Sequence, residues 1–190
     1  MPAVASSLLV IGGARSGKSR YAQARAEALD ARLVFVATAQ AFDDEMIDRI
    51  ARHRADRGPR WMTVEEPLDL PAAISTHSSE GSAVLVDCLT LWASNLLLAD
   101  HDPTVAAQAL TEAISSCRGP LILVANEVGL GIVPDNALAR QFRDYAGLIN
   151  QAVAAAVGEV VMTVAGIPVP IKLGDISVPG IEQVWHIRAS

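Results

Sequence analysis

Apolar runs of four to six residues recur along the chain and alternate with longer segments of helical periodicity. Such runs are typical of strands that are covered on both faces of a parallel sheet. Strands are predicted at 8–11, 33–37, 83–86, 121–125 and 160–165. Helices are predicted at about 18–29, 43–57, 89–98, 104–117 and 136–157. This alternation predicts an α/β fold, with a mostly parallel sheet wrapped by helices.

The composition changes this picture little. With 190 residues, 51% of them hydrophobic, the chain can bury a full core as a single domain spanning 1–190. We find no internal repeat and no low-complexity linker. The C-terminal stretch 173–190 has mixed polarity, and it is read either as a short strand or as a tail of uncertain role.

The charge balance excludes some partners. A net charge of −6 without a broad basic patch argues against nonspecific binding to nucleic acid or to an anionic membrane surface. No stretch approaches the ~20 apolar residues that a membrane-spanning helix needs, and the first four residues lack the basic start of a secretory signal. We therefore expect a cytoplasmic protein that holds its anionic ligands locally.

The segment between the first predicted strand and the first predicted helix fits the phosphate-binding pattern G-x-x-x-x-G-K-[ST]. Its residues are Gly12, Gly13, Ala14, Arg15, Ser16, Gly17, Lys18 and Ser19. Glycines let the backbone fold around phosphate oxygens, and the following helix points its amide groups at the anion. Lys18 supplies charge for the β- and γ-phosphates, and the Ser19 hydroxyl is a ligand for Mg²⁺. The strand and the helix on either side disfavour a chance match by a glycine-rich turn.

Ligands of open α/β sheets bind beyond the carboxyl ends of the strands, so residues that follow the other apolar runs are further candidates. Asp87 stands where P-loop enzymes carry the acid that holds Mg²⁺, although an aspartate there could also cap the next helix. Asn126 and Glu127 open a glycine-rich loop, 126–134, which is either a tight connection or a contact for Mg²⁺ or substrate.

The segment 43–57 opens with acids and closes with bases, which complements a helix dipole. Arg49, His53 and Arg57 form a stripe at i, i+4 spacing. Repulsion between like charges favours the neutral, nucleophilic form of a histidine placed between arginines, and the arginines could bind phosphates. The alternative is a solvated helix histidine without a role.

Together these motifs resemble the bifunctional adenosylcobinamide kinase/adenosylcobinamide-phosphate guanylyltransferase family. The resemblance covers about 8–172 and rests on the segments 12–19, 43–57 with Trp61, 86–90 and 126–134, and on Phe142, Arg143, Asp144, Gly147 and Asn150. It implies a RecA-like P-loop NTPase fold, commonly assembled as a homotrimer. It also implies two reactions: phosphorylation of the aminopropanol hydroxyl of adenosylcobinamide by ATP or GTP, and transfer of GMP from GTP to that phosphate through a guanylylated histidine.

Carried over residue by residue, the resemblance makes His53 the acceptor of GMP and Lys18 the second catalytic residue. Some relatives have two adjacent histidines in this segment, whereas here the neighbour is Arg52. Ser19 and Asp87 become the residues that hold Mg²⁺. Besides the P-loop, the implied nucleotide site contains Ala37, Thr38, Ala39, Arg54, Ala55, Asp56, Arg57, Glu65 and Asp87. Because Glu66 follows Glu65 directly, either carboxylate could face the site.

Two other functions remain as alternatives. A simple small-molecule kinase would use the P-loop and Asp87 without a nucleophilic histidine. A GTP-dependent switch usually reads guanine with Asn-Lys-x-Asp after a late strand, whereas this chain has Asn126-Glu127-Val128-Gly129 there. The absence of that motif favours the enzymatic reading.

Overall fold

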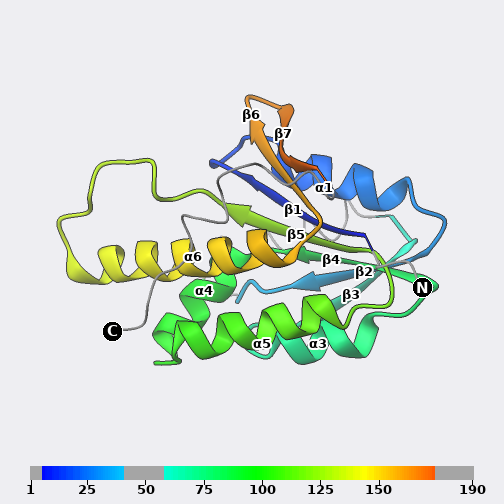
Figure 1. The fold of residues 1–190 in the computed structure, drawn as a ribbon, viewed down its shortest axis with the longest axis horizontal. Coiled ribbons are helices and arrows are strands. Elements are labelled where there is room, and N and C mark those ends of the chain that lie inside the picture. Colours follow the sequence, from blue (N-terminus) through cyan, green and yellow to red (C-terminus); the bar gives the residue numbers. More distant parts are fainter. Residues whose placement is uncertain (1–5, 41–57, 174–190) are drawn as a thin grey trace.

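The computed structural model describes residues 6–40 and 58–173, which build one seven-stranded sheet with helices on both faces (Figure 1). The strand order is β3-β2-β4-β5-β1-β6-β7. The strands are β1 (Ser7–Gly12), β2 (Arg32–Ala37), β3 (Trp61–Glu65), β4 (Ser82–Asp87), β5 (Leu121–Asn126), β6 (Glu159–Val164) and β7 (Ile167–Leu173). The helices are α1 (Lys18–Glu27), α3 (Leu70–His77), α4 (Leu89–Leu98), α5 (Pro103–Ser115) and α6 (Ala137–Ala156).

Burial on both faces of the sheet explains the apolar runs of the central strands. One hydrophobic cluster packs α3, α4, α5 and α6 against one face, and a second cluster packs α1 against the other. Alternate residues of β2, β4 and β5 point into the two clusters, so each of these strands must be apolar throughout. The five predicted strands and four of the predicted helices are confirmed to within two residues, whereas the predicted helix 43–57 lies outside the described residues.

Three elements are missing from the sequence prediction. β3 pairs with β2 at one end of the sheet, and α3 follows it with only eight residues. At the opposite end, β7 pairs antiparallel with β6, although every other pairing in the described sheet is parallel. Pro168 and Pro170 suit such an edge position, because a proline removes a ladder donor.

The strand register brings predicted site residues together at the carboxyl ends of the parallel strands. Ala37 at the end of β2 is paired with Glu65 on one side and with Asp87 on the other. Gly12 at the end of β1 is paired with Asn126 and with Thr163. The predicted P-loop NTPase fold, with a RecA-like and mostly parallel sheet, is therefore confirmed. The extent of a single domain over 1–190 stays a prediction.

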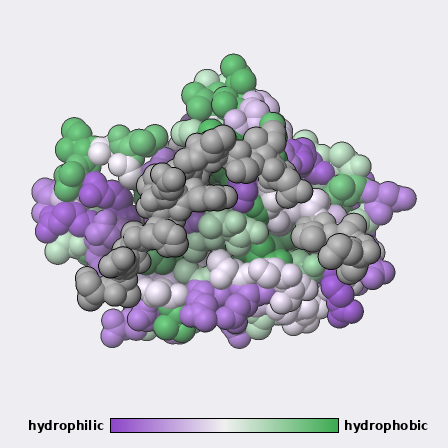
Figure 2. All heavy atoms as spheres, viewed as in Figure 1, coloured by the Kyte–Doolittle hydropathy of each residue, from purple (hydrophilic) through white to green (hydrophobic). Residues whose placement is uncertain are grey.

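Two projections carry exposed apolar side chains. They are the loop between β5 and α6, where Ile132 is 97% exposed, and the β6–β7 hairpin, where Ile167 is 65% exposed. Figure 2 shows hydrophobic surface gathered on both. Among the helices that the structure describes, none combines the length and the hydrophobicity needed to cross a membrane.

Candidate functional site

The phosphate-binding pattern forms a compact turn between β1 and α1. Gly17 stands at the N-cap of α1 with φ 92°, a left-handed conformation that glycine adopts without strain. The turn is closed by a hydrogen bond from the Ser16 amide to the Gly13 carbonyl at 3.3 Å. Among the described residues, no side chain caps the first turn of α1. Its amide groups are thus available to an anion.

The residues of this P-loop differ in exposure. Gly13, Ala14 and Arg15 are exposed, whereas Gly12 and Ser16 are buried. Lys18 is partly buried, and its Nζ donates to the Gly13 carbonyl at 3.3 Å. The ammonium group is therefore folded over the P-loop.

Lys18 and Asp87 come from different elements and act on a common neighbour, Cys88. Burial raises the pKa of the Cys88 thiol to about 11, and the negative charge of Asp87 adds to this shift. The positive charge of Lys18 acts on the same thiol in the opposite direction. Both charges therefore lie near the start of α4, which suits a P-loop site with an acid at the end of another strand.

Asp87 is not the cap of the helix that follows it. The N-cap of α4 is Cys88, which disfavours the alternative of a simple capping aspartate. Asp87 is half-buried at the end of β4, and Ser19 is half-buried in the first turn of α1. One carboxylate and one hydroxyl beside a phosphate cradle suit Mg²⁺, which usually completes its shell with phosphate oxygens and water.

Thr38 is fully buried, and its hydroxyl is engaged by the backbone that follows Asp87. Thr38 Oγ1 accepts from the Cys88 amide at 2.9 Å and donates to the Cys88 carbonyl at 2.7 Å. Asn95 on α4 donates through Nδ2 to the carbonyls of Thr38, at 2.8 Å, and Pro67, at 2.9 Å. Thr38 therefore supports Asp87 from within the protein, while Ala37 and Ala39 on either side of it are partly exposed.

The two adjacent acids after β3 have different surroundings. Glu66 Oε1 accepts from the amides of Leu68, at 3.0 Å, and Asp69, at 2.8 Å, in the connection to α3. Glu65 is exposed and lies beside Ala37 in the sheet register. This arrangement favours Glu65 as the acid of the nucleotide site.

The end of β5 is fixed beside the P-loop. The Asn126 amide donates to Thr90 Oγ1 at 2.6 Å, and Asn150 Nδ2 donates to the Asn126 carbonyl at 3.2 Å. The Glu127 amide donates to the Gly12 carbonyl at 3.1 Å. Glu127 Oε1 accepts from the Gly129 amide, which stabilises the start of the loop 126–134. Thr90 and Asn150 thus hold this connection against the site.

Comparison with known proteins agrees with this geometry. The family model described as cobinamide kinase / cobinamide phosphate guanyltransferase matches residues 8–171. The chain belongs to this family. It is therefore an enzyme of this kind.

Curated relatives of this family member are similar over most of their length. The bifunctional adenosylcobalamin biosynthesis protein CobP of Pseudomonas aeruginosa is 48% identical over 166 residues, which cover 86% of this chain and 96% of that protein. The protein CobU of Salmonella typhimurium, described in the same words, is 44% identical over 181 residues, covering 87% and 99%. A solved structure from Pyrococcus horikoshii OT3, titled as a structural study of PH0250, shares the fold with TM-score 0.55 at 9% identity, covering 90% and 87%.

For this member of the cobinamide kinase / cobinamide phosphate guanyltransferase family, the described residues account for only part of the predicted site. His53 and the adjoining Arg54, Ala55, Asp56 and Arg57 lie outside them. Within them, the structure brings the P-loop, Ala37 and Asp87 to one edge of the sheet. Sequence reasoning missed Asn95 and Thr163, whose signal is a polar residue within an apolar segment.

Proposed function

We propose that this chain is a bifunctional adenosylcobinamide kinase and adenosylcobinamide-phosphate guanylyltransferase of cobalamin biosynthesis. The first reaction moves the γ-phosphoryl group of ATP or GTP to the aminopropanol hydroxyl of adenosylcobinamide. The second transfers GMP from GTP to that phosphate, giving adenosylcobinamide-GDP and pyrophosphate. The observation that carries the proposal is the P-loop, whose Lys18 acts with Asp87 on the same neighbour, in a chain of this family.

In the kinase step, phosphoryl transfer needs positioning and charge stabilisation more than covalent help. The P-loop amides and Lys18 hold the β- and γ-phosphates, and Ser19 and Asp87 are the residues that would hold Mg²⁺. Bound there, Mg²⁺ would neutralise charge on the phosphate oxygens. Thr38 and Asn95 keep the end of β4 in place, so that the Asp87 carboxylate does not need to reorganise.

In the guanylyl step, a neutral imidazole nitrogen of His53 attacks the α-phosphorus of GTP, and pyrophosphate leaves. A phosphate oxygen of adenosylcobinamide phosphate then attacks the same phosphorus, and the P–N bond breaks to restore the histidine. Support for His53 comes from the family resemblance and from the arginines on its predicted helix face. Arg54 to Arg57, Ala37, Ala39 and Glu65 complete the proposed nucleotide site, and the buried Thr38 supports it from within the protein.

The assembly and location are part of the same proposal. We expect a cytoplasmic homotrimer, formed from single P-loop domains that span 1–190. The exposed apolar residues Leu130, Ile132 and Ile167 support burial of surface between subunits.

Incubation with Mg²⁺ and GTP labelled at the α-phosphate, followed by denaturing electrophoresis, tests the proposal. The native chain should acquire a label that is labile to acid and stable to alkali, and His53→Ala should not. His53→Ala should retain part of the kinase activity toward adenosylcobinamide. A native chain that phosphorylates adenosylcobinamide without acquiring label would instead be a simple kinase.

A further inference from the structure

The turn between β6 and β7 packs directly against the P-loop. Ser16 Oγ and Thr163 Oγ1 lie 2.8 Å apart, and the two residues are only 8% and 1% exposed. Thr163 Oγ1 also donates to the Ile11 carbonyl at 3.4 Å, in which arrangement the Ser16 hydroxyl is the donor to Thr163. The Gly166 amide donates to the Ser16 carbonyl at 2.9 Å. Ser16 is therefore held through its side chain and through its backbone.

The contact is too close for larger residues on the P-loop side. A Cβ atom at Gly12 would lie 2.5 Å from Thr163 Oγ1 and 2.7 Å from the Thr163 carbonyl oxygen. A Cβ atom at Gly17 would lie 3.2 Å from the Gly166 Cα. Gly12 and Gly17 thus also allow β6 and its turn to approach the P-loop closely, in addition to leaving room for phosphate.

These contacts come from outside the P-loop, whereas others are internal to it. The Ser16 amide and Lys18 Nζ both bond to the Gly13 carbonyl, so neither contact fixes the P-loop relative to the sheet. Thr163 and Gly166 reach it from β6 and its turn, on the side opposite the β5 connection at Glu127. They set where the stretch 13–17 stands before a ligand arrives.

We propose that Thr163 is a positioning residue for nucleotide binding, acting through Ser16. This inference rests on the proposed function only in taking the P-loop as the site of the nucleoside triphosphate. With the Thr163 hydroxyl in place, the P-loop amides are already arranged for the phosphates, and binding costs less conformational entropy. Without it, Ser16 loses its buried partner, and the P-loop samples arrangements that do not bind.

Three variants test the role of the hydroxyl. Thr163→Val removes the hydroxyl and keeps the branched shape, whereas Thr163→Ser keeps the hydroxyl. The control, Thr111→Val, removes an exposed hydroxyl that donates to the Gln108 carbonyl within α5. The dissociation constant of Mg·GTP is measured by calorimetry for each, together with the thermal midpoint. We expect Thr163→Val to raise the dissociation constant about ten-fold. Thr163→Ser should stay close to the native value, and Thr111→Val should equal it.

A fourth variant, Ser16→Ala, removes the same bond from the P-loop side. If the two hydroxyls act through one bond, Ser16→Ala with Thr163→Val should bind no more weakly than the weaker of the two single variants. Full additivity would overturn the proposal. So would a Thr163→Val variant with a lower thermal midpoint and native affinity, because the hydroxyl would then be merely structural. A native chain that binds Mg·GTP without either transferase activity would instead contradict the proposed function.

Discussion

Thr38→Val should weaken both the protein and its use of Mg²⁺, because the Thr38 hydroxyl satisfies the backbone that follows Asp87. The Cys88 carbonyl keeps a second donor, the Trp92 amide at 3.2 Å, when the hydroxyl is removed. The Cys88 amide loses Thr38 Oγ1, the partner that the structure gives it, in a place where Cys88 is 5% exposed. A buried donor left without a partner costs about 1–3 kcal/mol, so we expect a loss of about 2 kcal/mol in the free energy of unfolding.

Urea unfolding followed by circular dichroism measures this loss, with Thr38→Ser as the matched variant that keeps the hydroxyl. On the proposed role of Asp87, the Mg²⁺ concentration for half-maximal kinase activity should also rise in Thr38→Val. Thr38→Ser should remain near the native chain in both measurements. A Thr38→Val variant within about 0.5 kcal/mol of the native chain, with unchanged Mg²⁺ dependence, would refute the reasoning.

Three further predictions concern other charged and titratable groups. Lys18→Ala should reduce both adenosylcobinamide phosphorylation and GMP labelling about a hundred-fold, since both steps use the triphosphate; full kinase activity in the folded variant would refute the P-loop assignment. The Arg25 guanidinium lowers the pKa of Glu159, so the pair stabilises the fold above pH 4.5 and loses this effect as the pH falls further. Because both side chains are partly exposed, Glu159→Gln should cost only about 0.5–1 kcal/mol in urea unfolding at pH 7 and nothing in strong acid; an equal cost at both pH values would contradict this. Iodoacetamide at pH 8 should modify Cys117 before Cys88 in the folded chain, because Cys88 is buried and its pKa is raised to about 11; peptide mass spectrometry that finds equal labelling would contradict the burial argument.

The sequence predicts the elements that are buried on two faces and misses those at the edges. β4 and β5 are apolar at almost every position because helices cover both of their sides. β3 and β7 each lie at an end of the sheet. β3 has only five residues, among them Thr63 and Glu65, and β7 carries Pro168 and Pro170, which are atypical of a strand interior. α3 has eight residues, too few for a clear helical period. The prediction thus fails where an element is short or contains residues that are atypical of it.

The site follows the same division. The P-loop and Asp87 are predictable because each is a local pattern attached to one strand. The supports of the site are not local: Thr38 bonds to Cys88 across 50 positions, and Ser16 to Thr163 across 147. A single sequence shows only a hydroxyl residue within an apolar segment, and it does not show which distant residue that hydroxyl contacts. Only the fold identifies the partner.

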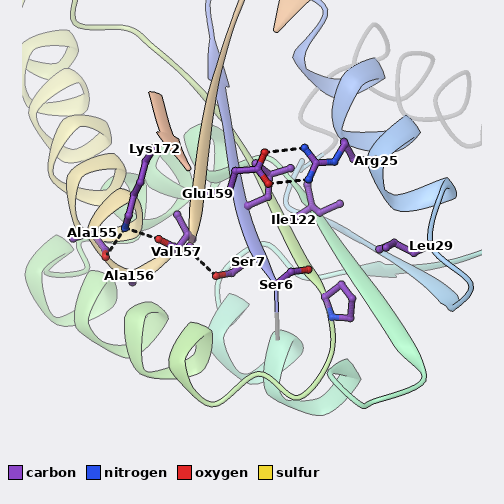
Figure 3. A pocket seen from close by; sticks show the side chains of 13 residues that line it. Ser6, Ser7, Arg25, Leu29, Ile122, Ala155, Ala156, Val157, Glu159 and Lys172 are labelled. Carbon is purple, nitrogen blue, oxygen red and sulfur yellow. Dashed lines mark hydrogen bonds and ion pairs between the residues drawn. The ribbon is translucent and has the colours of Figure 1, made fainter. Parts of the chain in front are cut away.

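β6 contacts both the P-loop and α1, and its contact with α1 lies at the amino-terminal ends of the strands, away from the candidate site. A cavity of about 560 Å³ lies there, between α1, β6 and the end of α6 (Figure 3). Its charged side chains are turned to protein partners: Arg25 binds Glu159 through both carboxylate oxygens, at 2.9 and 2.8 Å, and Lys172 Nζ donates to the last carbonyls of α6. These groups are therefore not directed at a ligand.

The consequence for the candidate site comes from the position of Glu159 and Thr163 on the same strand. Glu159, the first residue of β6, binds Arg25 on α1. Thr163, near the other end of β6, contacts Ser16 in the P-loop that precedes α1. The P-loop and its helix are thus attached to β6 at two points, the P-loop through Thr163 and α1 through Glu159. Loss of the Arg25–Glu159 pair leaves the Thr163 contact intact. Glu159→Gln should therefore reduce stability without changing the affinity for Mg·GTP, which separates the two ends of β6 by their effects.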